Sequence, residues 1–345
     1  MAAERVLHIE VVSPGLLTTI QDTRGRRGFE RYGVPAGGAL DTFAAAAANA
    51  LVGNPADAAV IEITLVGPTL RLPAAPTVFA LAGADLGADL DGQAIAPGWS
   101  WLARPVATLS FGERRQGARS YLALGGGIQV PAVLGSRATD VRAGFSGLAG
   151  RPLRAGDQLP LGSEADPRTH AGRYLAGALA SPDACPTLRV LPGPHLDRFQ
   201  PGSLDALCAT TWHIGEQADR MGYRLVGPPL RHTHGADVAS LGLPVGAVQV
   251  TGDGRPIVLL ADHQPTGGYT VLACVIRADL PLLAQRGPGE PVRFAQTTLA
   301  AAHAALRARQ AALQTVDPDA AVWAGIRLAE SGSQAVRTMP PGQTA

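Results

Sequence analysis

The stretch QVTGDGRPIVLLADHQPTGGY, Gln249–Tyr269, holds a short apolar run bounded by glycine and proline, a pattern typical of a buried strand in a β-rich protein. The predicted strand, Ile257–Ala261, runs directly into three polar side chains, Asp262, His263 and Gln264. A side chain at the point where a strand meets a loop is held by a rigid element and stays open to a ligand. We therefore expect Asp262 and Gln264 to belong to a functional site.

Two glycines, Gly267 and Gly268, follow in a predicted loop, and Tyr269 opens a second apolar run, Val271–Ile276. Glycines in a loop let backbone N–H groups approach a bound anion closely. The alternative is an Asx turn, in which the Asp262 carboxylate caps the amides of its own loop. The spacing alone does not distinguish the two interpretations.

Similar short runs extend along the chain and predict a mainly β fold. The 42 glycines and 28 prolines favour many short strands and tight turns over long helices. The runs predicted as strands are Val6–Val12, Val60–Leu65, Thr77–Ala82, Ala107–Phe111, Ser120–Leu124, Thr187–Leu191, Val248–Val250, Ile257–Ala261, Val271–Ile276 and Val292–Phe294.

Two segments have helical patterns. Asp41 is a good N-cap for a helix over Thr42–Leu51, and Gly53 is placed to end it. The alanine-rich segment Gln296–Gln314 predicts a second helix near the C-terminus. One face of this helix carries leucines seven residues apart, at Leu299, Leu306 and Leu313.

The length of 345 residues exceeds one ordinary core and suits two domains. Between Ser163 and Pro186 the sequence becomes polar and small, which is typical of an interdomain connection. Within that connection, Arg173–Ala180 is a candidate for a short helix. The last residues of the chain have the composition of a loose tail.

All 29 basic residues are arginines, and the chain contains no lysine. A Schiff-base lysine, a P-loop lysine and a biotinylated lysine are therefore excluded. A cation that binds a carboxylate or phosphate here has to be a guanidinium, a helix N-terminus or a metal. The arginines nearly balance 28 acidic residues, and no basic stretch carries interleaved aromatics, so we expect no nucleic-acid partner.

Three cysteines, Cys185, Cys208 and Cys274, are odd in number and far apart, which indicates a reducing compartment without disulfides or a zinc site. Among the eight histidines, His232 and His234 come nearest to a metal-ligand spacing, and we predict no metal. The N-terminus lacks a signal-peptide pattern, and no apolar run approaches the roughly 18 residues of a membrane span. We expect a soluble cytoplasmic protein without a membrane partner.

A second polar cluster lies near the N-terminus, where Gln21 and Asp22 follow an apolar stretch and Arg26 lies among glycines. Such an arginine can bind a carboxylate or phosphate together with backbone donors. The alternative is a set of surface arginines on a flexible loop. Asp219 and Arg220 also have two interpretations: a solvated ion pair of little energetic worth, or an arginine that points into a cleft and is oriented by Asp219.

Seven motifs occur in order along roughly residues 5–300: SPGLLTTIQD, GVPAGGALDTFAAAAANALVGN, IEITLVGPTL with Glu62, YLALGGGIQVPAVLGSRAT, DRMGYRLVGPPL, QVTGDGRPIVLLADHQPTGGY and LAQRGPGEPVRF. Together they resemble the biotin-dependent carboxyltransferase family, also called allophanate hydrolase subunit 2. That family includes the C component of bacterial 5-oxoprolinase, the branch that the motifs resemble most, and the matching part of urea carboxylase.

The resemblance implies a fold of two cyclophilin-like β-barrel subdomains with a few short helices and an alanine-rich C-terminal helix. On this basis subdomain A spans residues 1–165 and subdomain B spans residues 185–325. Residues 326–345 would form a loose C-terminal tail.

The resemblance also implies a function shared with separately encoded proteins. In the 5-oxoprolinase branch, a three-component system opens the 5-oxoproline lactam to L-glutamate at the expense of ATP. We expect this activity here, with ATP bound at the level of the complex. The implied partners are the B component of that system, which is of the allophanate hydrolase subunit 1 type, and its A component, a lactam hydrolase.

Two alternatives remain open. One is a carboxyltransferase that moves a carboxyl group to urea or a related amide from a biotin carrier, which has to be another protein because this chain has no lysine. The other is a non-enzymatic antagonist of a kinase inhibitor.

By position, the family pattern implies a catalytic set of Asp262, Gln264 and Arg220. In this set Asp262 orients or deprotonates the substrate amide, Gln264 contacts its carbonyl, and Arg220 together with Arg26 neutralises the developing oxyanion. The implied substrate-binding residues are Gln21, Asp22, Arg26, Asp41, Gln249, Thr266, Gly267, Gly268 and Tyr269. The segment around Gly25 is one residue longer than the usual family pattern, which leaves the direction of Arg26 open.

Overall fold

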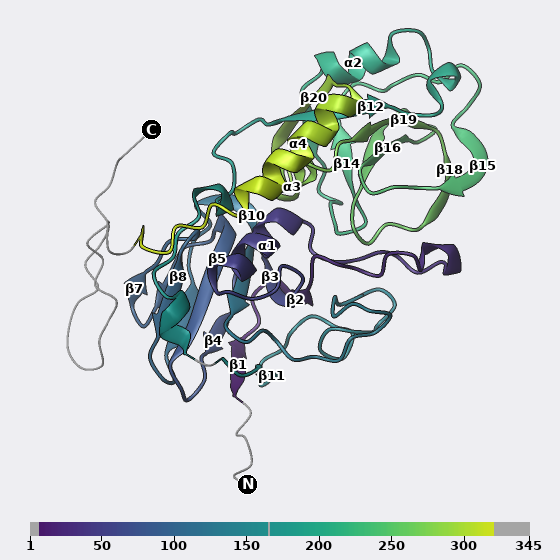
Figure 1. The fold of residues 1–345 in the computed structure, drawn as a ribbon. Helices are drawn as coiled ribbons and strands as arrows, with labels where there is room; N and C mark the ends of the chain where they lie inside the picture. The colour runs from purple at the N-terminus through teal and green to yellow at the C-terminus, as the bar shows by residue number, and fades with distance from the viewer. Residues whose placement is uncertain (1–6, 165, 321–345) are drawn as a thin grey trace.

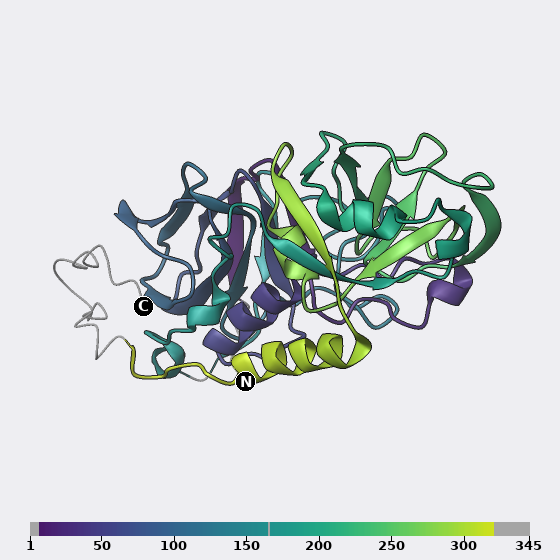
Figure 2. The ribbon, with the colours of Figure 1, turned by 90° about the horizontal axis from the view of Figure 1, so that it is seen from above.

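A computed structural model describes residues 7–164 and 166–320 and forms two β-rich halves that lie side by side (Figures 1 and 2). Each of the ten apolar runs predicted as strands coincides with a strand of the structure. The predicted mainly β fold is confirmed. No helix within the described ranges is long and apolar enough to cross a membrane.

The N-terminal half consists of two facing sheets. One has the strand order β11-β1-β4-β9-β6-β7, and the other has the order β2-β3-β10-β5-β8. The bounds of the first are β11 Gln158–Pro160, β1 His8–Ser13, β4 Thr69–Arg71, β9 Thr108–Phe111, β6 Ala88–Leu90 and β7 Gln93–Ala94. The bounds of the second are β2 Leu17–Gln21, β3 Val60–Thr64, β10 Gln116–Leu124, β5 Thr77–Asp85 and β8 Ser100–Ala103.

The core of this half lies between the two sheets. Alternation along β1 turns Ile9 and Val11 inward, where they join Ile61 and Ile63 of β3 and Leu122 of β10. All of these side chains are fully buried. Burial on one face of each sheet fixes the strand register, because a one-residue slip would turn every apolar side chain outward.

Helix α1 (Thr42–Leu51) covers the outer face of the second sheet. As predicted, Asp41 caps it, accepting a hydrogen bond from the Ala44 N–H at 2.8 Å. Its alanines allow close approach to β5 and β10. Gly53, with φ +73°, follows the end of the helix, and the ring of His170 occupies the space that a Cβ there would need.

The C-terminal half is a closed barrel of seven strands in the order β12-β19-β16-β17-β14-β13-β20. A parallel pair, β12 with β20, and antiparallel pairs elsewhere complete the ring. The bounds are β12 Thr187–Pro192, β19 Val271–Val275, β16 Ala247–Val250, β17 Pro256–Leu259, β14 Gly222–Val226, β13 Trp212–Ile214 and β20 Pro291–Gln296. Two short helices accompany the barrel, α2 Ser203–Ala209 and α3 Leu280–Ala284.

A separate two-stranded ribbon of β15 (Asp237–Gly242) and β18 (Thr266–Tyr269) lies at the outer side of the barrel (Figure 1). The predicted loop glycines, Gly267 and Gly268, are therefore strand residues. Neither has a positive φ, and a Cβ on Gly267 would lie 2.6 Å from Leu243 Cδ1. The prediction of a loop was wrong, because both glycines lie in β18.

The described part of the connection between the halves, from residue 166 on, packs on the N-terminal half. Leu175 and Ala178 join the apolar cluster beneath α1, and the Ala180 N–H donates to the Gly83 carbonyl at 2.8 Å. The helix predicted over Arg173–Ala180 is only a 3₁₀ turn, η3, at Ala176–Ala178. The other 3₁₀ turns are η1 Glu30–Tyr32, η2 Pro167–His170 and η4 Leu196–Arg198.

Helix α4 (Leu299–Ala312) confirms the predicted C-terminal helix, and Thr298 caps it. Of its predicted leucine face, Leu299 is 58% exposed, whereas Leu306 and Leu313 are half-buried and Leu313 packs against the apolar cluster beneath α1. The helix also buries Ala302 against Ile276 and Ala278. Figure 2 shows α4 lying across the base of the molecule near α1. The predicted tail, residues 326–345, lies outside the described residues.

Candidate functional site

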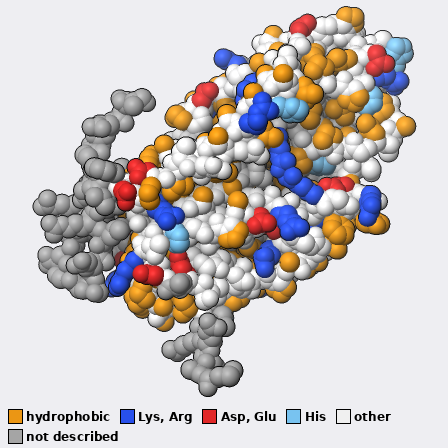
Figure 3. Space-filling view, viewed as in Figure 1, with side chains coloured by type: hydrophobic (Ala, Val, Ile, Leu, Met, Phe, Trp, Pro, Cys, Tyr) orange, Lys and Arg blue, Asp and Glu red, His pale blue; other side chains and the backbone are white. Residues whose placement is uncertain are grey.

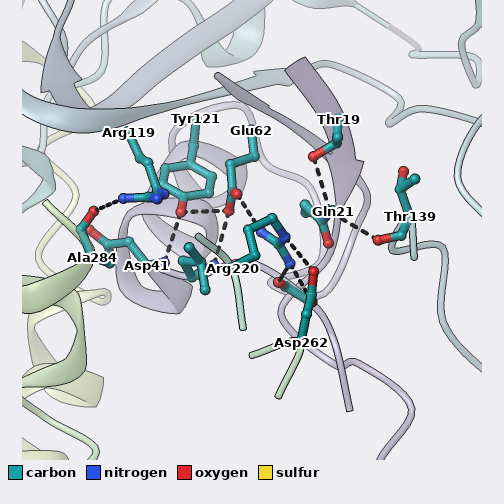
Figure 4. A network of polar contacts seen from close by, with 12 residues as sticks. Thr19, Gln21, Asp41, Glu62, Arg119, Tyr121, Thr139, Arg220, Asp262 and Ala284 are labelled. Atoms are coloured by element: carbon teal, nitrogen blue, oxygen red, sulfur yellow. Dashed lines mark hydrogen bonds and ion pairs between the residues drawn. The ribbon is translucent and has the colours of Figure 1, made fainter. Parts of the chain in front are cut away.

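Asp262 and Arg220 lie at the same end of two paired barrel strands, since antiparallel pairing sets Gly222 of β14 opposite Leu259 of β17. The Asp262 N–H donates to the Arg220 carbonyl at 3.0 Å. The Arg220 guanidinium donates twice to the Asp262 carboxylate, from Nε to Oδ2 at 2.8 Å and from Nη2 to Oδ1 at 2.9 Å (Figure 4). This bidentate geometry is the strong form of an arginine–carboxylate pair and fixes both groups.

The same guanidinium joins the two halves of the molecule. Its Nη1 donates to Glu62 Oε1 on β3, and its Nη2 donates to the Gly38 carbonyl at 2.6 Å. The other Glu62 oxygen accepts from the Leu40 N–H at 2.9 Å and from the Tyr121 hydroxyl at 2.8 Å. Arg220 is thus bonded through all three nitrogens to groups from both halves. On the surface, Figure 3 shows basic and acidic side chains side by side where the halves meet.

Burial and mutual pairing decide the ionisation of this network. Desolvation lowers the pKa of Arg220, but the carboxylates of Asp262 and Glu62 raise it more, so it lies above its ordinary value. Desolvation raises the pKa of Glu62, and Arg220 with Arg119 lowers it more, so it lies below its ordinary value. Burial raises the pKa of Asp262 against the opposing effect of Arg220. Pairing therefore dominates the pKa of Glu62, and burial dominates that of Asp262.

Further hydrogen bonds fix the position of Asp41, a predicted substrate-binding residue. Its N–H donates to the Tyr121 hydroxyl at 2.8 Å. One carboxylate oxygen caps α1, and the other accepts from Gln285 Nε2 at 2.8 Å. Gln285 directly follows α3, and its Oε1 accepts from the Ala118 and Arg119 N–H groups at 3.0 Å. Both Asp41 oxygens are engaged inside the chain, where they tie α1 to α3.

Arg26 is buried close to this network, and only part of its guanidinium forms hydrogen bonds. Its Nη2 donates to the Ala138 carbonyl, and its guanidinium lies 4.5 Å from the centre of the Phe145 ring. Its Nε and Nη1 have no hydrogen-bond partner among the described residues. A Cβ built on Gly37 would lie 2.7 Å from Arg26 Nη1 and 3.9 Å from Asp262 Oδ1, so both atoms lie beside Gly37. Burial lowers the pKa of Arg26.

Gln21 and Asp22 are buried beside Arg26 but differ in whether their side-chain oxygens have hydrogen-bond partners. Gln21 Nε2 donates to Thr19 Oγ1 at 3.0 Å and to the Thr139 carbonyl at 3.3 Å. Its Oε1 has no partner among the described residues. The Asp22 carboxylate accepts from the Gly25 N–H, the Ser136 hydroxyl and the Arg137 N–H at 2.6–2.8 Å. Asp22 is therefore occupied in holding two loops together.

The remaining predicted residues lie around the β15–β18 ribbon. Thr266 and Tyr269 are the ends of β18 and are exposed. Gln249, on β16, is buried, and its Nε2 donates to the Tyr269 carbonyl at 3.4 Å. Gln264 is exposed just beyond Asp262. The glycines between these residues pair with β15 and do not form an anion-binding loop.

Asp219 does not orient Arg220. Its carboxylate accepts from the Met221 N–H at 2.8 Å and from the Gly222 N–H at 3.3 Å, a local turn at the start of β14. The interpretation of a solvated Asp219–Arg220 pair was also wrong, because Arg220 is 6% exposed and pairs elsewhere.

The expected absence of a histidine metal site is compatible with the packing of His232, whose ring lies 4.6 Å from that of Phe199. Its Nε2 lies 2.8 Å from Thr270 Oγ1. Within residues 7–164 and 166–320, no group of three or more histidine, cysteine or acidic side chains is arranged to hold a metal ion.

Three residues of the network were not predicted as site residues: Glu62, Tyr121 and Gln285. Glu62 carried a usable signal, because an acidic residue inside the apolar run VIEIT is buried on either face of a covered sheet and needs a partner. Tyr121 and Gln285 carried no comparable signal. Their roles follow from contacts across 59 and 244 residues of sequence.

Residues 32–296 match the family model described as carboxyltransferase domain, subdomain A and B. The chain is 42% identical over 305 residues to the C component of 5-oxoprolinase from Escherichia coli K12, a match that covers 88% of this chain and 94% of that protein. It is 32% identical over 332 residues to urea amidolyase of Lachancea kluyveri, covering 89% of this chain but 18% of that protein.

Two solved structures are similar along most of the chain. The K. lactis urea amidolyase matches with a TM-score of 0.83 and 28% identity, over 90% of this chain and 20% of that one. TTHA0988 matches with a TM-score of 0.76 and 37% identity, over 86% of this chain and 57% of that one. The chain thus spans little more than half of TTHA0988 and a fifth of the amidolyase.

Proposed function

The chain belongs to the carboxyltransferase domain family of subdomains A and B, and on that premise we propose that it is a component of an ATP-dependent 5-oxoprolinase complex. The complex opens the 5-oxoproline lactam to L-glutamate. The observation that carries this proposal is the match to the C component of 5-oxoprolinase, which extends over nearly the whole of both chains. The urea enzymes, in contrast, contain this region as a small part of a much longer protein.

The chemistry requires a group that accepts a hydrogen bond from the lactam N–H and a group that stabilises negative charge on the lactam oxygen. Asp262 supplies the first, because its carboxylate is held by Arg220 and its side chain is 15% exposed. Each Asp262 oxygen uses one lone pair on Arg220 and keeps another for the lactam N–H. Gln264, exposed next to it, contacts the lactam carbonyl.

Arg26 supplies the second group. Arg220 is already bonded through all its nitrogens, so it orients Asp262 instead of meeting the substrate. Arg26 keeps two buried nitrogens without a partner among the described residues, and its Nη1 lies beside Gly37, as Asp262 Oδ1 does. A preorganised donor in a water-poor site is suited to stabilise a developing oxyanion.

ATP binding belongs to the assembled complex in this proposal. The chain has no lysine and no glycine-rich nucleotide motif of its own. The expected partners are a B component of the allophanate hydrolase subunit 1 type and a lactam-hydrolase A component. Calorimetry checks the point: the isolated chain should give no ATP binding, and the complex should bind ATP. Tight binding of ATP to the isolated chain would contradict it.

The experiment that tests the function is ATP-dependent cleavage of 5-oxoproline by the reconstituted complex. Asp262→Asn should abolish turnover while the complex still assembles in size-exclusion chromatography. Asp253→Asn, at an exposed turn of the barrel, is the matched control and should retain activity. Retained activity in Asp262→Asn would remove this carboxylate from the mechanism.

A second candidate function is that of a carboxyltransferase, which the likeness to urea amidolyase favours. The biotin would have to be carried by another protein, since this chain has no lysine to attach it. ATP turnover that depends on urea and a biotinylated carrier, and not on 5-oxoproline, would select this function over the first.

A further inference from the structure

A cavity of about 270 Å³ lies in the N-terminal half, at one end of the second sheet. Three neighbouring strands meet this end: β2 and β10 finish there and β3 begins there, because β3 is antiparallel to both. The segments that line the cavity are the ones that follow β2, precede β3 and follow β10, together with a loop over residues 135–137. Neither Arg220 nor Asp262 lines it.

Asp22 lines the cavity and holds two of its wall segments together. Its carboxylate holds the turn to Gly25 on one side and Ser136 with the Arg137 N–H on the other. These hydrogen bonds of the buried Asp22 carboxylate fix the segments that carry Arg24 and Arg137 on the cavity wall. The walls are therefore positioned by the fold and do not depend on a ligand.

Two guanidiniums on this wall have spare donors. Arg137 Nε donates to the Val130 carbonyl at 2.8 Å, which fixes the direction of the side chain. Its terminal nitrogens, and the whole guanidinium of Arg24, make no ion pair or side-chain hydrogen bond within the described part of the chain. Two such cations beside one polar cavity suit a carboxylate.

Two residues with acceptor oxygens, Asn54 and Asp57, line the same cavity. Asn54 Nδ2 donates to the Leu124 carbonyl at 2.8 Å and to Asn49 Oδ1 at 3.1 Å, which leaves Asn54 Oδ1 as a free acceptor. Asp57 lines the cavity and forms no ion pair in the described chain. These oxygens suit an N–H or ammonium group.

Gly127 also lines the cavity, with a φ of +71° that other residues adopt only with strain. A Cβ there would make ordinary van der Waals contacts of 3.8–4.0 Å with Ala58, Gln129 and Asn54, so the backbone conformation, and not the space, favours glycine.

We propose that this cavity is a second ligand site, for a small carboxylate that carries an N–H or ammonium group, the class of the α-amino acids. Arg24 and Arg137 bind the carboxylate, and Asp57 with Asn54 Oδ1 accepts from the nitrogen. Neither Asp262 nor Arg26 lines the cavity, so this proposal does not rest on the function proposed above.

Calorimetry on the full chain tests this site with three probes. L-glutamate has both groups, acetate has only the carboxylate, and urea has only the N–H groups. L-glutamate should bind at least about tenfold more tightly than acetate or urea, since each probe that lacks one group loses a charge-assisted bond. Arg137→Gln and Arg24→Gln should each weaken L-glutamate binding about tenfold or more.

Arg154→Gln, at an exposed arginine outside the cavity, is the matched control and should leave binding unchanged. Arg24→Gln keeps the test valid if Arg137→Gln does not fold, because Arg24 makes no side-chain bond within the described chain. Absence of L-glutamate binding at millimolar concentration, equal binding of acetate or urea, or binding unaffected by both substitutions would each overturn the proposal.

Discussion

Replacing Arg220 with methionine tests how much its guanidinium contributes to the junction between the two halves, where Gln285 also bonds across. The substitution keeps much of the apolar stem but leaves Glu62, 1% exposed at its side chain, and Asp262, 15% exposed, without their shared cation. The Gly38 carbonyl loses its donor as well. Two negatively charged carboxylates then lie close together in a buried site. Removing one partner of a buried ion pair destabilises the fold because the remaining charge is left uncompensated.

Removing one partner from a buried pair destabilises a protein by about 3–5 kcal/mol. At roughly 2 °C per kcal/mol for a chain of this size, the melting temperature should fall by about 6–10 °C. Differential scanning calorimetry measures this directly. Arg71→Met is the matched control, because Arg71 pairs with Glu10 on the surface at 3.1 Å and the change should be within about 0.5 kcal/mol.

A double variant separates charge from packing. Adding Glu62→Gln to Arg220→Met removes one of the two stranded charges and should recover part of the lost stability. The reasoning fails if Arg220→Met melts within about 2 °C of the wild type. It also fails if the double variant is less stable than Arg220→Met alone.

Three further outcomes follow from single contacts. Tyr121→Phe removes the hydroxyl that donates to Glu62, and urea unfolding should show a loss of about 1–3 kcal/mol; no loss would mean that the bond is not made. Burial lowers the pKa of His263, so as pH falls below 6.5 the unfolded chain takes up a proton first and stability declines. Thermal melts at about pH 7.5 and pH 5.5 should show a smaller decline in His263→Gln, and an equal decline would exclude this histidine. Gly67→Ala forces a methyl group into the Phe111 ring, so the melting temperature should fall, whereas an unchanged value would show that the ring moves freely.

The fold was predictable where local patterns decide it. Short apolar runs bounded by glycine and proline gave strands because each must bury one or both faces. The cap at Asp41 gave the start of α1 because its carboxylate satisfies a free N–H of the first turn. The leucine spacing of α4 predicted its packing only in part: Leu313 packs against the cluster beneath α1, but Leu299 is exposed and Ala302 is buried against Ile276.

The candidate site was predictable only in part. Asp262 stood out because polar residues at strand ends are commonly functional, and Arg220 stood out through the family resemblance. Their mutual pairing depends on which barrel strands are neighbours. The partner Glu62 lies 158 residues from Arg220, and only docking of the two halves brings it near. Gly267 and Gly268 were assigned to a loop because paired glycines are typical of loops, and the pairing of β18 with β15 is not visible in the sequence.

The most direct measurement of the central claim is the kcat of the complex carrying Arg26→Gln. Loss of a preorganised oxyanion donor should lower kcat for 5-oxoproline cleavage by about 10²–10³-fold, with Arg26→Lys recovering part of it and Arg154→Gln behaving as wild type. A kcat for Arg26→Gln within about threefold of the wild type, in a complex that assembles normally, would contradict the account.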